Sequence, residues 1–196
     1  LFSAPLFVAA QTPANSFTIE GKLDGFADGT KISLYKNGVQ TEWAATKLEK
    51  GKFTLKEKVN EPVLSFIVIE NVPNAVEVYV ENAVITVKGN KSQPGKYEIS
   101  GSRSHKDFTE FIADFMPLAQ QLNATASSIN ATMPGGGRDS LMNSYTSQQE
   151  GLQQQIDKFV KDKPGSFVTA FVLNATYQFN NDIVMLENRF SKLQEK

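Results

Sequence analysis

The sequence predicts an α+β protein: an antiparallel β-sandwich or open barrel of about eight short strands, then a segment of about four helices packed against it. Residues 16–102 alternate between apolar and polar side chains, with Gly, Asn and Asp turns at near-regular intervals. From Ser104 the apolar residues recur at steps of three and four, which is the spacing of one helix face. Apolar residues make up 40% of the 196 residues and include fourteen phenylalanines, enough for a sizeable core without disulfides.

The predicted β domain, residues 16–102, consists of short alternating stretches. "SFTIEGKL" places Phe17 and Ile19 on one face, and the same alternation recurs in "TKISLYK", "TEWAATKL", "KFTLKEKV", residues 76–88 and "KYEIS". Asn37-Gly38 and Lys50-Gly51 predict turns, because these residue types tolerate a positive φ. "VLSFIVIE" is almost continuously apolar, so we expect this strand to be covered on both faces.

The predicted helical segment, residues 103–196, begins with a long amphipathic helix that Ser104 caps. Its apolar stripe is Phe108, Phe111, Ile112, Phe115, Ala119, Leu122, Ala126, Ile129 and Met133. Pro117 predicts a kink, and Pro134 followed by three glycines predicts the helix end. A second helix is expected over residues 139–161, a third after a Ser166 cap, and a fourth after an Asn181 cap. The third is apolar almost all round and is predicted to be the most buried.

Residues 1–15 are interpreted as a signal-peptide remnant and linker. "LFSAPLFVAA" is an apolar run that ends in small residues, the pattern of a cleavage site, and it is too short to span a hydrocarbon core about 30 Å thick. The alternative is a buried first strand. The signal-peptide interpretation leads us to expect an exported protein without a membrane span. The net charge of −1 makes nucleic acid an unfavourable partner.

The residues that could carry chemistry are few. No cysteine is present, which excludes thiol catalysis and thiolate metal sites within this chain. The single histidine, His105, lacks ligand partners at helical spacing and is expected to be solvated at the start of a helix. Glu70, Glu77, Glu81 and Glu98 lie on predicted strands, and two of them facing each other could serve a hydrolase, although a solvated sheet face is the favoured explanation. We expect no catalytic residue, metal or cofactor.

Several motifs resemble the β-rich domain of unknown function at the N-terminus of bacterial envelope thioredoxin-like proteins of the TlpA/ResA type. The residues that match are "F-x-I-x-G" from Phe17, "G-K-F-x-L" from Gly51 before Pro62, and "Y-x-E-N-x-x-I-x-V-x-G" from Tyr79. In the helices, Pro164, Ser166, Val168 and Leu173 match "P-x-S-x-V-x-x-x-x-L". The resemblance covers about Phe17 to Leu193. It implies a periplasmic or cell-envelope location in a Gram-negative bacterium, with a thioredoxin domain carrying W-C-x-x-C after the helices.

The resemblance implies that this chain is a non-catalytic accessory or interaction domain of an exported thiol-disulfide oxidoreductase. Its expected partner is a downstream thioredoxin-like domain in the same polypeptide. The apolar residues of the last two predicted helices form the possible docking face: Phe167, Phe171, Ile183, Leu186, Phe190 and Leu193. On the fourth helix we expect the apolar members to point inward and the charged residues outward. A stand-alone envelope module that binds a peptide, glycan or lipid is the alternative.

Overall fold

The computed structural model of the chain describes residues 15–179 and 182–193. It divides into a β unit that ends at His105 and a helical unit that begins at Lys106, and each unit is described by itself. The predicted signal-peptide remnant lies outside the described residues.

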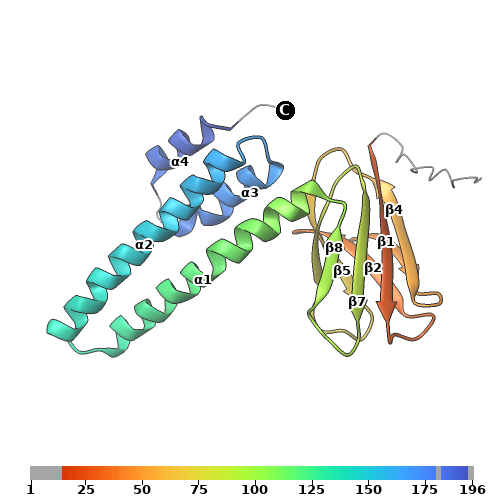
Figure 1. The fold of residues 1–196 in the computed structure, drawn as a ribbon, viewed down its shortest axis with the longest axis horizontal. Helices are drawn as coiled ribbons and strands as arrows, with labels where there is room; N and C mark the ends of the chain where they lie inside the picture. The colour runs from red at the N-terminus through yellow and green to blue at the C-terminus, as the bar shows by residue number, and fades with distance from the viewer. Residues whose placement is uncertain (1–14, 180–181, 194–196) are drawn as a thin grey trace, which may run out of the picture. The chain divides into compact units, whose positions relative to one another are not determined.

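The β unit is a sandwich of two four-stranded sheets (Figure 1). One sheet has the strand order β4-β1-β7-β8 and the other β3-β2-β5-β6. The strands are β1 (Ser16–Asp24), β2 (Lys31–Lys36), β3 (Glu42–Lys47), β4 (Lys52–Lys58), β5 (Val63–Ile69), β6 (Val76–Val80), β7 (Val84–Asn90) and β8 (Tyr97–Ser100). These eight strands in two sheets confirm the predicted β-sandwich architecture.

One strand pair departs from the antiparallel prediction. β1 runs parallel to β7, with Ile19 opposite Ile85, while its other neighbour β4 is antiparallel. Alternating polarity specifies which face of a strand is buried but not the direction of its neighbour. The consecutive strands that pair, β2 with β3, β5 with β6 and β7 with β8, are antiparallel because a short connection joins them, whereas β1 and β7 come from distant parts of the sequence and can align in either direction.

Two glycines explain details of the sandwich. Gly21, on β1, lies under the ring of Phe53, and a Cβ at this position would sit 1.8 Å from Phe53 Cε1. Any side chain here would therefore displace a core ring, which gives a steric reason for the glycine in "F-x-I-x-G". Lys50 and Gly51 have φ values of 51° and 71° and form the predicted tight turn before β4.

The core of the sandwich is formed by the inward side of each strand. Its fully buried members include Phe17, Ile19, Leu34, Ile67 and Ile85. The prediction that β5 is covered on both faces holds in part: Ser65, Ile67 and Ile69 are buried on one face, whereas the other face goes from buried Leu64 to Val68, which is 37% exposed.

The helices are α1 (Arg103–Ala131), α2 (Gly136–Asp162), α3 (Phe167–Thr176) and α4 (Ile183–Phe190), with a 3₁₀ turn at Tyr177–Phe179. In the helical unit α1 and α2 form a long hairpin, and α3 and α4 lie beside the C-terminal half of α2 (Figure 1). The α+β class with a helical C-terminal segment is thus confirmed. Pro117 lies inside α1 as expected, and a kink there stays a prediction. Among the described residues no helix is both long and apolar enough to span a bilayer.

A phenylalanine cluster forms the core of the helical unit. Phe111 stacks on Phe115 at 4.8 Å between centroids and meets Phe159 of α2 edge-on at 5.0 Å. Phe115 in turn contacts Phe179 at 5.6 Å. Most of the predicted stripe of α1 is buried, with Ile112 and Ala126 half-buried. Its last member, Met133, is 86% exposed because the helix stops at Ala131.

A buried carboxylate ties α1 to the loop between α2 and α3. The side chain of Asp107 is 4% exposed and accepts hydrogen bonds from Lys163 Nζ and Ser166 Oγ, both at 2.7 Å. Lys163 Nζ also reaches the exposed Glu110 at 2.9 Å. The hydrogen bond to Asp107, and then that to Glu110, raises the pKa of Lys163. Ser166 also caps α3, as predicted, by accepting from the Val168 N–H.

Candidate functional site

His105 is buried, which corrects the expectation of a solvated residue. It is 8% exposed, and its Nδ1 accepts a hydrogen bond from the Tyr79 N–H at 3.4 Å. Burial lowers the pKa of this imidazole, so its neutral form is favoured. The helix cap also differs from the prediction: Ser102, not Ser104, accepts from the His105 N–H at 2.9 Å and α1 begins at Arg103. Periodicity alone did not resolve this shift of two residues.

Of the four glutamates predicted on strands, only Glu77 and Glu98 lie on strands, since Glu70 and Glu81 directly follow β5 and β6. Glu81 accepts from the N–H groups of Arg103 and Ser104 and from Ser104 Oγ, so its carboxylate is engaged by the first turn of α1. Glu70 accepts from the Lys31 N–H at 3.0 Å. Glu77 and Glu98 are exposed and stand opposite Phe66 and Lys88 in their ladders. Within the described part of the chain no three His, Asp or Glu side chains gather into a possible metal site.

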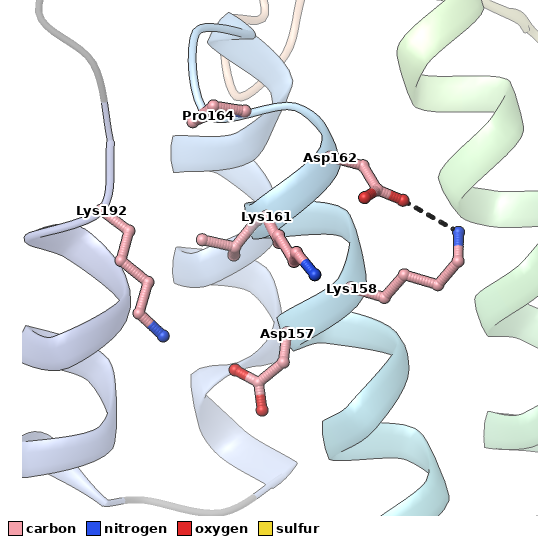
Figure 2. Close-up of a pocket in the computed structure, with 7 residues that line it drawn as sticks. Asp157, Lys158, Lys161, Asp162, Pro164 and Lys192 are labelled. Atoms are coloured by element: carbon pink, nitrogen blue, oxygen red, sulfur yellow. Dashed lines mark hydrogen bonds and ion pairs between the residues drawn. The ribbon is translucent and has the colours of Figure 1, made fainter.

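A surface groove of about 710 Å³ lies between α2 and α4 (Figure 2). Its lining residues are Asp157, Lys158, Val160, Lys161, Asp162, Pro164 and Lys192. Lys158 pairs with Asp162 at 3.1 Å, and Asp157 pairs with Arg189 at 2.9 Å. The groove therefore contains paired charges and further lysines near the C-terminal ends of two helices, where the helix dipole favours cations. This set of groups offers neither a nucleophile with its base nor an acid pair.

The outward side of α4 is the most exposed apolar surface of the predicted docking face. Ile183 is 59% exposed and Phe190 is 44% exposed, while Leu186 is half-buried. At about 100° per residue these three side chains share one side of the helix. The expectation that they point inward is therefore wrong for Ile183 and Phe190.

A charged residue occupies the inward side of α4. Arg189 is 6% exposed, and it lies about 120° around the helix from Ile183. Its Nε donates to Asp157 Oδ1 at 2.9 Å and its Nη2 to the Gln153 carbonyl at 3.3 Å. The α4 cap is Asp182, which accepts from the Met185 N–H, one residue after the predicted Asn181. Sequence reasoning missed Arg189 because a charged residue on an amphipathic helix ordinarily faces solvent.

The remaining members of the face lie on α3 and after α4. Phe167 is 37% exposed, whereas Phe171 is half-buried and meets Phe108 edge-on at 6.1 Å. Leu193 is also half-buried. Five of the ten residues of α3 are buried, the largest buried share of the four helices, which confirms the prediction that it is the most buried of them, although its other side is exposed. Val184, which the prediction did not include, is 62% exposed.

Comparison with known families bears on the β unit. Residues 17–108 match a family model described as a domain of unknown function (DUF4369). The match begins on β1 and ends in the second turn of α1, so it includes the Tyr79, Glu81 and His105 contacts. No curated protein matches the chain. Residues 17–108 thus resemble a domain of unknown function.

Proposed function

We propose that the chain is a non-catalytic accessory domain of an exported thiol-disulfide oxidoreductase of the TlpA/ResA type. In this proposal the helical unit docks a thioredoxin-like domain of the same polypeptide, and the protein works in the periplasm or cell envelope of a Gram-negative bacterium. The match of residues 17–108 to a domain of unknown function is consistent with the resemblance on which the proposal rests.

The observation that carries the proposal is the exposed apolar side of α4. Ile183 and Phe190 lie two turns apart on the same side of the helix, with Leu186 between them. Large apolar side chains grouped on one exposed face indicate an interaction surface, while isolated ones do not. Aromatic and aliphatic residues of this size are also the usual anchors of protein interfaces.

The division of labour follows from side-chain chemistry. Thiol–disulfide exchange requires an attacking thiolate, and this chain contains no cysteine. The chain would therefore supply binding area and orientation, and the docked domain would supply both thiols. For this reason we expect no reduction of insulin disulfides by this chain alone.

The test measures binding of a thioredoxin-like domain of this type, added in trans, by titration calorimetry. Phe190→Asp should weaken binding at least tenfold, since it places a charge within the apolar contact, an effect of about 1.4 kcal/mol or more. Asn188→Asp is the matched control: it adds the same charge to an exposed position of α4, about 160° around the helix from Phe190. This control should bind as the unmodified chain does.

Two results would contradict the proposal. One is equal binding by the Phe190→Asp chain and the unmodified chain. The other is insulin reduction by this chain without an added domain. Binding of an exported peptide, glycan or lipid to the same face, with no affinity for the thioredoxin-like domain, would favour a stand-alone binding module instead.

A further inference from the structure

We propose that α4 is a latch helix that detaches from α2 in the folded protein while the rest of the helical unit stays closed. Detachment separates Arg189 from α2 and uncovers the polar residues of α2 beneath it. This inference concerns α4 and α2 alone and does not depend on the proposed docking partner.

α4 holds α2 mainly through Arg189; α4 also packs against α3, and its Met185 and Leu186 are half-buried. Arg189 is the one buried residue of α4, and it holds α2 through Asp157 Oδ1 and the Gln153 carbonyl. The Asp157 side chain is 51% exposed, so water screens the ion pair on one side. By contrast α3 buries five residues, among them Val172 at 0% exposure, and its Ser166 cap is bonded to Asp107.

The surface of α2 under this segment is polar and incompletely paired. Gln149, Gln153 and Asp157 are four residues apart and therefore follow one side of α2. Gln149 donates to the carbonyl of Phe179 in the 3₁₀ turn, and Asp157 accepts from Arg189 of α4, which places this side of α2 against the 3₁₀ turn and α4. Both amide atoms of Gln153 are buried without a hydrogen-bond partner among the described groups.

These contacts make the closed position of α4 weakly favourable. When α4 moves away, the unpaired amide of Gln153 can form hydrogen bonds with water. This gain offsets part of the free energy lost when the hydrogen bonds of Arg189 to α2 break. The apolar contacts that α4 loses on detachment are those of the half-buried Met185 and Leu186, because Ile183, Val184 and Phe190 are already exposed in the closed position. Few buried apolar contacts are characteristic of segments that open locally below the global unfolding transition.

The test uses the absence of cysteine, since any introduced thiol is unique. Gln153→Cys is labelled with a thiol reagent under native conditions and compared with Val172→Cys, whose position faces the core from α3. We expect Gln153→Cys to react at least about tenfold faster than Val172→Cys after correction for intrinsic thiol reactivity. Its labelling rate should change little with urea at low concentrations, because local opening exposes little surface. Val172→Cys should react only through global unfolding, with a steep urea dependence.

A second variant separates latch opening from general loosening. Adding Arg189→Gln to Gln153→Cys removes the ion pair and should accelerate labelling several-fold further, whereas adding it to Val172→Cys should change labelling only by its effect on global stability. Equal labelling of both thiols with the same urea dependence would overturn the proposal. So would labelling of Gln153→Cys that Arg189→Gln leaves unchanged.

Discussion

Lys163 contacts two carboxylates that differ in burial, and removal of each charge in turn measures what burial contributes to a salt bridge. Asp107 has a 4% exposed side chain, and Glu110 has a 47% exposed one. Their distances to the same Nζ are nearly equal, 2.7 and 2.9 Å. Asp107→Asn and Glu110→Gln are therefore matched variants in which shape is kept and a single negative charge is removed.

The two variants should differ clearly in free energy of unfolding. Asp107→Asn loses the charge in two hydrogen bonds, those from Lys163 and Ser166, and forces an amide into a site built for an acceptor. We expect the free energy of unfolding to fall by about 2–4 kcal/mol. This is in the lower part of the range for breaking a buried ion pair, because Lys163 keeps its contact with Glu110 and some contact with water. Glu110→Gln should cost less than about 1 kcal/mol, as exposed pairs do.

Urea unfolding followed by circular dichroism at 222 nm is the appropriate assay, because Asp107 stabilises the helical unit. The midpoint should fall for Asp107→Asn at an unchanged m value, which marks a change of stability and not of compactness. Fluorescence of the single tryptophan, Trp43 on β3, follows the sandwich separately. Equal losses for the two variants, or none for Asp107→Asn, would refute the reasoning that burial sets the strength of this pair.

Three further predictions concern other contacts. Because burial lowers the pKa of His105, the unfolded chain binds more protons than the folded one as the pH falls below about 6.5, so stability should decline there. His105→Gln should flatten this decline in thermal melts between pH 7 and pH 5. An identical pH profile for the variant would contradict the prediction. Phe111→Ala should cost about 3–5 kcal/mol in urea unfolding, since it empties the centre of the ring cluster, while Met116→Ala, exposed on the same helix, should cost under about 1 kcal/mol; similar losses would place the wrong face inward. Glu81→Gln should lower stability by about 1 kcal/mol and speed amide exchange in the first turn of α1, because the carboxylate accepts from that turn; unchanged exchange there would exclude the capping role.

Helix α1 shows which features a local sequence pattern can predict and which it cannot. The three- and four-residue spacing of Phe108, Phe111 and Phe115 predicted both the helix and its buried face, and the structure confirms them. The groups that satisfy the start of this helix come from elsewhere in the chain, since Glu81 lies more than twenty residues earlier. Nothing in the alternating pattern around Glu81 distinguishes a capping carboxylate from a solvated one.

The sequence by itself determined the element types, the strand turns and the apolar faces of the sandwich and of α1, because these depend on periodicity and on local backbone preferences. Only the tertiary structure decided that β1 runs parallel to β7, that His105 is buried against Tyr79, and that Arg189 is the inward residue of α4. Each of these depends on a partner distant in the chain. A polar side chain can be buried when a distant partner completes its hydrogen bonds. The residues next to it in the sequence do not indicate which distant residue that partner is.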